Sequence, residues 1–332
     1  MNKLYIFIFI ISILDCSKNT DNANSHMLNF SNLNKIRNKA ELLFASGEYC
    51  LSLSYYNQLV ENDYFLADDL YNGYMSSLKC ETGDFKIMYE EKLIQYGVCD
   101  NFFSSHNPEF LRNRYNHVTK FAGIDNVLRD SLMIIVDFDQ FLRDTPSRHD
   151  SIYFYDRINY ENFVRLINHR GFPSVGRIGI DCSSSERGFR PNTYEIPLLH
   201  FAKNGFDVYE ILDTALNLGE MHPYTYASIY DTGKYGQLQE GEYFAENYIL
   251  SFGRVPYVIK EAEIPLEVVN SRDSIGLYTY EEYKILYRHV IDRIASRESG
   301  DNEKFLRLPF SIANLPTSVL SQFPDYKKME LK

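Results

Sequence analysis

The second half of the chain carries carboxylates and imidazoles of the kind that acid–base chemistry requires. Asp139, His200 and Asp231 are the candidate catalytic residues, because carboxylate and imidazole groups can take up and release a proton near neutral pH. Amide, guanidinium and further carboxylate groups could hold the hydroxyl, amide or carboxylate groups of a substrate. These candidate substrate-binding residues are Gln140, Arg143, Asp156, Asn159 and Gln237. The set is compatible with a hydrolase in which a carboxylate is the base and His200 its partner.

A polar network without chemistry is the competing interpretation of the same residues. Hydrogen-bonded polar side chains can fix buried helices relative to one another. His200 also stands in the mostly apolar segment 196–201, where a histidine is commonly a core residue. The sequence has neither a Gly-x-Ser-x-Gly elbow nor a His-Glu-x-x-His helix. His200, His222 and Asp231 match no known metal-binding spacing, so we expect no metal and no cofactor.

The residues around Asp139 predict a helix over about 127–143. Leu132, Ile135 and Val136 lie on one stripe of that helix, and Asp139 and Arg143 continue the stripe at the next turns. Because an apolar stripe faces the core, we expect this charged pair to be largely withdrawn from water. A second helix should follow Asp156 and Asn159 and end at Arg170, where Gly171 and Pro173 stop it.

Several short motifs in this half follow one another in a recognisable order. They are Asp139-Gln140-x-x-Arg143, Asp156-x-x-Asn159, Gly171-Phe172-Pro173, Val175-Gly176, His200, Gly219-Glu220, Ala227-x-x-x-Asp231, Tyr235-Gly236-Gln237 and Val269-Asn270-x-Arg272-x-x-Ile275-Gly276-Leu277. The series resembles a bacterial family known as a domain of unknown function and marked by its Asp-Gln-x-x-Arg helix. The resemblance covers residues 125–289 and implies no particular reaction.

The preceding region repeats a helical pattern. Apolar residues at three- and four-residue steps flank Gly47-Glu48-Tyr49 and again Gly83-Asp84-Phe85. This arrangement resembles the tetratricopeptide repeat, in which a glycine opens the turn between two helices and an aromatic residue wedges them apart. The two glycines are 36 residues apart, where that family has a period of 34. A generic pair of helical hairpins is the alternative.

The N-terminus has the layout of a secretory signal peptide. Lys3 precedes the apolar run 4–14, which is too short to span a bilayer as a helix. Cys16 follows directly in the sequence Ile13-Leu14-Asp15-Cys16, which resembles the lipobox of bacterial lipoproteins. We therefore expect export and a lipid on Cys16 that anchors the protein to the cell envelope. Cleavage at another position, without a lipid, is the alternative.

Composition restricts the partners. The formal net charge is −11 and no basic stripe is visible, so we expect no nucleic-acid partner. Four cysteines remain besides Cys16, and their spacing is not that of a metal site. Cys50 and Cys80 are the best candidates for a disulfide, although ordinary buried thiols are the favoured interpretation.

These patterns predict a mostly α protein, with tetratricopeptide-like helical hairpins followed by an α-rich second domain with little β. The expected segments are a signal peptide over 1–16, a flexible tether over 17–27, hairpins over 28–100, a connecting segment over 101–124, the domain of unknown function over 125–297 and an irregular tail over 298–332. We expect a binding or scaffolding role at the envelope, with a protein or glycan partner. The alternative is the hydrolase described above.

Overall fold

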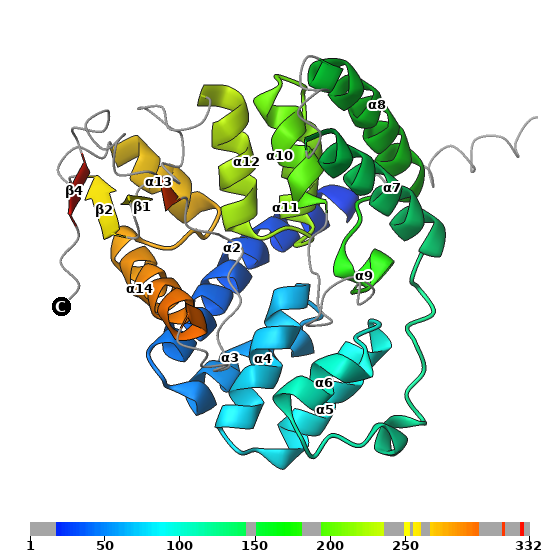
Figure 1. Ribbon diagram of the computed structural model, residues 1–332, viewed down its shortest axis with the longest axis vertical. Helices are drawn as coiled ribbons and strands as arrows, with labels where there is room; N and C mark the ends of the chain where they lie inside the picture. The colour runs from blue at the N-terminus through cyan, green and yellow to red at the C-terminus, as the bar shows by residue number, and fades with distance from the viewer. Residues whose placement is uncertain are drawn as a thin grey trace, which may run out of the picture.

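The computed structural model is mostly helical, in agreement with the predicted fold class (Figure 1). It describes residues 18–143, 151–180, 194–235, 249–252, 255–259, 266–298, 314–315 and 326–328. The helices of the first half are α2 (Lys18–Ala45), α3 (Tyr49–Glu61), α4 (Ala67–Lys79), α5 (Gly83–Gln95), α6 (Asp100–His106) and the 3₁₀ turn η1 (Arg112–Tyr115). Those of the second half are α7 (Asn126–Arg143), α8 (Ile152–Arg170), α9 (Val175–Ile178), α10 (Glu195–Lys203), α11 (Tyr209–Asn217), α12 (Pro223–Tyr235), α13 (Leu266–Ser274) and α14 (Tyr280–Glu298).

The first half is built of helical hairpins that repeat every 34 residues. Helices α3 and α5 begin at residues 49 and 83 and end at residues 61 and 95, and α2 and α4 end at residues 45 and 79. The backbone also turns with positive φ at matching places, at Gly47 and Glu81 before the second helix and at Asp63 and Gly97 after it. Consecutive helices pack against each other, and their apolar faces form one continuous core.

The repeat register differs by two residues from the one predicted from the glycines. Gly47 is the turn residue of the first hairpin, with φ of +83°. Its structural counterpart is Glu81, with φ of 58°, whereas Gly83 is already the first residue of α5. A positive φ disfavours residues other than glycine but persists where the flanking helices dictate the turn. The prediction that Gly83 opens its turn is therefore wrong.

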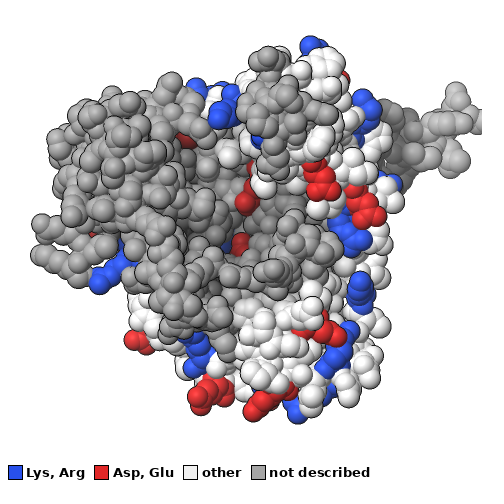
Figure 2. All heavy atoms as spheres, in the orientation of Figure 1, with Lys and Arg blue, Asp and Glu red and all other residues white. Residues whose placement is uncertain are grey.

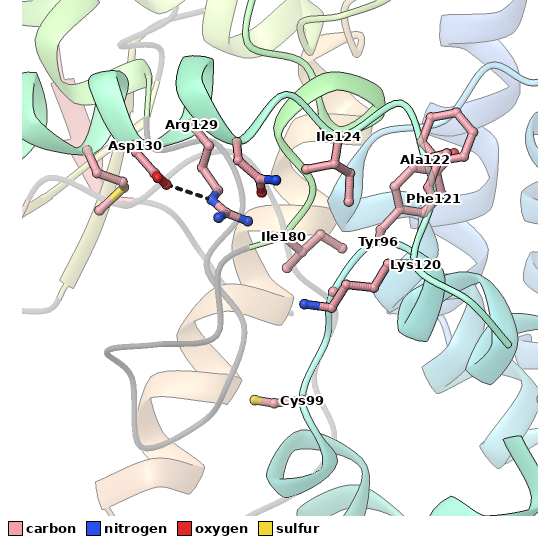
Figure 3. A pocket seen from close by; sticks show the side chains of 12 residues that line it. Tyr96, Cys99, Lys120, Phe121, Ala122, Ile124, Arg129, Asp130 and Ile180 are labelled. Atoms are coloured by element: carbon pink, nitrogen blue, oxygen red, sulfur yellow. Dashed lines mark hydrogen bonds and ion pairs between the residues drawn. The ribbon is translucent and has the colours of Figure 1, made fainter. Parts of the chain in front are cut away.

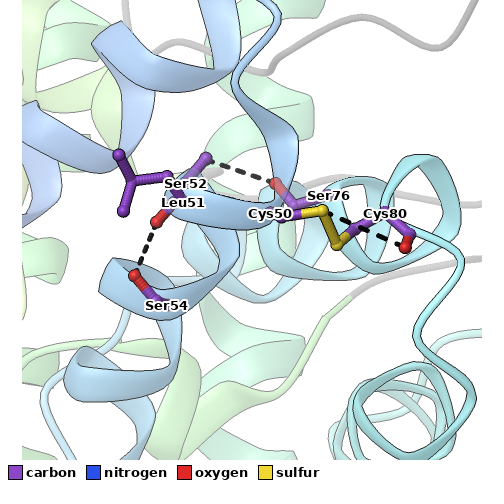
Figure 4. The surroundings of a disulfide bond; sticks show 6 residues. All are labelled: Cys50, Leu51, Ser52, Ser54, Ser76 and Cys80. Carbon is purple, nitrogen blue, oxygen red and sulfur yellow. Dashed lines mark hydrogen bonds between the residues drawn. A yellow bond between two sulfur atoms is a disulfide. The ribbon is translucent and has the colours of Figure 1, made fainter.

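A disulfide joins the two hairpins. Cys50, near the start of α3, is bonded to Cys80, which directly follows α4 (Figure 4). Nearby, the hydroxyl oxygens of Ser52 and Ser76 lie 3.4 Å apart between the same two helices. The pairing is the one that the sequence suggested, and the favoured interpretation of buried free thiols is wrong for these two residues. Cys99 is also disulfide-bonded.

The second half is a set of packed helices that folds back onto the first. Helices α7 and α8 form an antiparallel pair, and α10 contacts both of them as well as α12. Helix α14 packs against α2, which runs through the middle of the molecule (Figure 1). The amides of Asn34 and Asn38 in α2 donate to the carbonyls of Ile275 and Gly276, at 3.1 and 2.8 Å. One face of the hairpin array is thus covered by the chain itself.

Two predicted boundaries differ from the structure. Helix α2 begins at Lys18, so it includes most of the segment predicted as a flexible tether. The predicted irregular tail contributes β3 (Asn314–Leu315) and β4 (Tyr326–Lys328) to a small sheet with β1 (Ile249–Phe252) and β2 (Val255–Ile259). Its strand order is β3-β1-β2-β4, with only the β3–β1 pair parallel. Sheet pairing depends on partners distant in sequence, which the local pattern of the tail does not contain.

Candidate functional site

Asp139 is the centre of a polar cluster between α7, α8 and α10. Its carboxylate is fully buried and accepts a hydrogen bond from Arg143 Nη1 at 2.6 Å, one helical turn away. Gln140 Nε2 donates to Oδ2 at 2.7 Å. The Nδ1 atom of His200 lies 3.0 and 2.9 Å from the two carboxylate oxygens. The predicted burial of Asp139 is confirmed, and α10 supplies the imidazole that the sequence placed in the same set.

Arg143 connects this carboxylate to a second one. Its Nη2 atom lies 2.7 Å from Asp156 Oδ2, and Asn204 Nδ2 donates to the same oxygen at 2.6 Å. Asp156 is fully buried in the first half of α8. One guanidinium thus bridges two buried carboxylates on different helices. The sequence did not single out Asn204, which lies just beyond the end of α10 in a polar loop.

Burial in the cluster is uneven. The side chains of Arg143 and His200 are each 21% exposed to solvent, whereas those of Asp139 and Asp156 are 0% exposed. Asp156 Oδ1 and Asn159 Nδ2 are both buried, and neither has a hydrogen-bond partner within the described residues. These atoms are an acceptor and a donor located one turn apart on α8. Most buried polar atoms are paired, and a water molecule or a hydroxyl group can pair such an acceptor or donor.

Aromatic rings extend from the cluster along α8. Tyr153 and Tyr160 lie one turn before and one turn after Asp156 on the same face of the helix. Both rings stack on Phe206, with centroid distances of 5.5 and 5.0 Å and interplanar angles of 21° and 13°. Tyr153 is 58% exposed. The three-residue spacing of Tyr153 and Asp156 could have indicated that they share a face of the helix. The contact of Tyr153 with Phe206, by contrast, depends on the tertiary fold.

Two of the predicted residues are not seen to join this group. Asp231 is buried on α12, which packs against α10, and within the described ranges it makes no hydrogen bond to Asp139 or His200. Gln237 falls outside the described residues. Glu220 accepts a hydrogen bond from Ser174 at 3.0 Å, and burial raises its pKa.

A second buried polar group joins the two halves of the molecule, and the sequence did not predict it. Glu41 in α2 accepts a hydrogen bond from Tyr278, and Oε1 of Glu41 lies 3.8 Å from Nε2 of His222. All three side chains are buried. Burial raises the pKa of Glu41 well above its ordinary value, while burial together with the charge of Arg37 lowers the pKa of His222. His222 Nδ1 accepts from the backbone N–H of Tyr224 at 3.0 Å, so the proton of the neutral ring is on Nε2, towards Glu41.

On the face shown in Figure 2, acidic and basic side chains alternate along the right-hand edge. In the part of the chain that the structure describes, no group of three or more histidine, cysteine and carboxylate side chains is arranged to hold a metal. Of the helices in the described ranges, none combines the length and the apolar character that crossing a bilayer requires.

Comparison with protein-family models, with curated proteins and with solved structures finds no match to this chain.

Proposed function

We propose that the protein is an exported hydrolase of cell-envelope material, with an acid–base site at Asp139 and His200. The observation that carries the proposal is the orientation of His200 by Asp139 on a helix that leaves 21% of the imidazole side chain exposed. An ionised carboxylate can only accept hydrogen bonds, so the proton of a neutral His200 is on Nδ1. The Nε2 atom then has the free lone pair. A histidine fixed in this way by a carboxylate is a suitable general base.

The proposed reaction uses His200 as the group that moves the proton. His200 Nε2 takes a proton from a water molecule as that water attacks the substrate, and it returns the proton to the leaving group. Asp139 stabilises the imidazolium that forms between these steps, because its carboxylate contacts Nδ1. We propose Arg143, whose side chain is 21% exposed, as the group that holds an anionic or hydroxyl group of the substrate.

A sugar-containing substrate fits the surroundings of this site. Asp156 Oδ1 and Asn159 Nδ2 offer an unpaired acceptor and donor, and a hydroxyl group can satisfy both. The exposed ring of Tyr153 continues the row of aromatic rings at the same place on α8, and the apolar face of a sugar ring can pack against an aromatic ring. Glycans of the cell envelope combine these two properties.

The disulfides support the proposed location outside the cytoplasm. Cys50 is paired with Cys80, and Cys99 is also disulfide-bonded. Disulfides persist in oxidising compartments and are rare where thiols are kept reduced. The lipid on Cys16 is part of the same proposal. Replacing Cys16 by Ala should move the protein from the membrane fraction to the soluble fraction of the envelope, and unchanged membrane retention would contradict the lipid anchor.

The hydrolase is tested with purified peptidoglycan sacculi. We expect the protein to release soluble fragments, whose masses identify the bond that is cleaved. His200→Gln and Asp139→Asn should each lower the rate by about 10²-fold or more, the usual contribution of a general base. His169→Gln is the matched control, because His169 is an exposed histidine on α8 whose ring hydrogen-bonds to the Arg165 carbonyl of its own helix. Absence of release by the wild-type protein, or full activity of His200→Gln, would contradict the proposal.

Binding without chemistry is the second candidate function. It is favoured by the cluster itself, in which both oxygens of Asp139 are already occupied by Gln140, Arg143 and His200. In this case Asp139→Asn would change stability or affinity, and wild-type sacculi would be bound but not cleaved. The hairpin face formed by Asn34, Asn38 and Glu41 is not the binding surface in either case, because Ile275, Gly276 and Tyr278 cover it.

A further inference from the structure

A cavity of about 770 Å³ lies at the junction of the two halves, away from the Asp139 cluster. Its walls come from the end of α5 and the following loop, from the segment before α7, from the first two turns of α7 and from Ile180. Helix α7 links it to the proposed acid–base site. Arg129 at the cavity and Asp139 at the cluster are ten residues apart, which is about 15 Å along a helix.

The cavity has a fixed apolar wall. The rings of Tyr96 and Phe121 lie 5.5 Å apart and tilted by 43°, next to Ile180. Two backbone hydrogen bonds hold these segments together, from Ile180 N to Tyr96 O at 2.7 Å and from Phe121 N to Gln95 O at 2.9 Å.

Glycine is required where the segments approach each other. Gly179 has φ of +71°, and a Cβ atom there would lie 2.8 Å from the Tyr96 carbonyl oxygen. Such a contact is too close for a side chain, so the cavity wall depends on this glycine.

Two cationic side chains extend into the cavity. Figure 3 shows Lys120 and Arg129 directed towards the space beside Ile180. Within the described part of the chain, Lys120 makes no hydrogen bond or ion pair. Arg129 contacts its neighbour Asp130 through Nε at 3.3 Å, and this exposed pair leaves both Nη groups available. Lys120, Arg129 and Asp130 give the cavity lining more positive than negative groups, in a chain with a net charge of −11.

We propose that this cavity binds a small amphipathic organic anion. Its acidic head would lie between Lys120 and Arg129, and its apolar body would pack on Tyr96, Phe121 and Ile180. A ligand with only an acidic group would make no use of the apolar wall and would compete with water for the two cations. A ligand with only an apolar body would leave the two cations without a charged partner. The combination satisfies both parts of the cavity, which is the usual composition of a small-molecule site.

The test uses dansylglycine, a fluorescent aromatic carboxylate, and dansylamide, which lacks the carboxylate. We expect dansylglycine to bind with increased fluorescence and to bind about tenfold more weakly to Lys120→Gln and to Arg129→Gln, since each variant removes one charge-assisted contact. Dansylamide should bind the wild-type protein more weakly and should not respond to either variant. Lys39→Gln, which removes an exposed charge on α2, is the control and should change nothing.

A second variant tests the location. Met133→Trp should fill the cavity from α7 and abolish the binding of both probes. The proposal is overturned if dansylglycine does not bind, if Lys120→Gln and Arg129→Gln leave its affinity unchanged, or if Lys39→Gln weakens it equally. Binding of both probes to a folded Met133→Trp protein would also overturn it. Asp139→Asn should not change the affinity for dansylglycine. A failure of the proposed hydrolase can therefore be distinguished from a failure of this binding site.

Discussion

Arg37 in the first half and Arg143 in the second both hold buried carboxylates, but their surroundings differ. Arg37 Nε contacts both oxygens of Asp69 at 2.9 Å, Nη1 contacts Asn34 at 2.6 Å, and the pair is 1% exposed on each side. Arg143 bridges two carboxylates and keeps 21% of its exposure.

The comparison separates a structural ion pair from a candidate site. The Arg37 pair is withdrawn from water between α2 and α4, where a substrate has no access. The Arg143 cluster combines buried carboxylates with a partly exposed imidazole and guanidinium, which is the arrangement a substrate or water could reach.

Arg37→Ala should lower the free energy of unfolding by about 3–5 kcal/mol, because it leaves the Asp69 carboxylate buried without its partner. The measurement is urea denaturation followed by circular dichroism. Lys39→Ala, an exposed change on the same helix, should stay within about 0.5 kcal/mol of the wild-type protein. A loss below about 1 kcal/mol for Arg37→Ala would show that the pair is not a structural lock.

The double variant Cys50→Ser/Cys80→Ser should lower the free energy of unfolding by about 3 kcal/mol. The disulfide closes a loop with a sequence separation of 30 residues, and its removal increases the entropy of the unfolded chain. Thermal unfolding under oxidising conditions measures the effect. Reduction of the wild-type protein is a poor substitute, because Cys99 is also disulfide-bonded. An unchanged melting temperature would show that the Cys50–Cys80 disulfide does not stabilise the first half.

Arg143→Ala should cost less than Arg37→Ala, about 1–3 kcal/mol. The variant leaves Asp139 bonded to Gln140 and His200, and it leaves Asp156 bonded to Asn204. The two variants are compared in the same urea experiment. An equal or larger loss for Arg143→Ala would mean that its cluster is a structural lock like that of Arg37.

The junction between the halves should make stability depend on pH in two opposite directions. The folded-state pKa of Glu41 is raised, so its contribution is present below the ordinary carboxyl pKa of about 4.5 and is lost as the pH rises through the folded value. The folded-state pKa of His222 is lowered, so its contribution is present above about 6.5 and is lost as the pH falls through that range to the folded value.

The midpoints of urea unfolding, measured between pH 5 and pH 9, distinguish the contribution of Glu41 to stability from that of His222. Glu41→Gln keeps a partner for Tyr278 and should remove the loss of stability at rising pH. His222→Gln should reduce the loss at falling pH. If both variants retain the wild-type pH profile, these groups do not control the pH dependence of the junction.

Local sequence patterns predicted the helices more reliably than their register. The stripe of Leu132, Ile135 and Val136 predicted that Asp139 is buried, because helical periodicity alone decides which residues share a face. The glycine pattern misplaced the second hairpin turn by two residues, since Glu81 adopts the positive φ that Gly83 was expected to have. A turn imposed by the packing of its flanking helices leaves little trace in the local sequence.

The sequence by itself determined the helical class, the burial of Asp139 and the residue types available for chemistry, because these follow from composition and short-range periodicity. Only the tertiary structure decided that His200 contacts Asp139, that Asn204 and Phe206 complete the surroundings of Asp156, and that Glu41 meets Tyr278. The last contact joins residues 237 positions apart. Such contacts depend on how whole helices pack, and the free energy of packing is shared by many residues that no single motif contains.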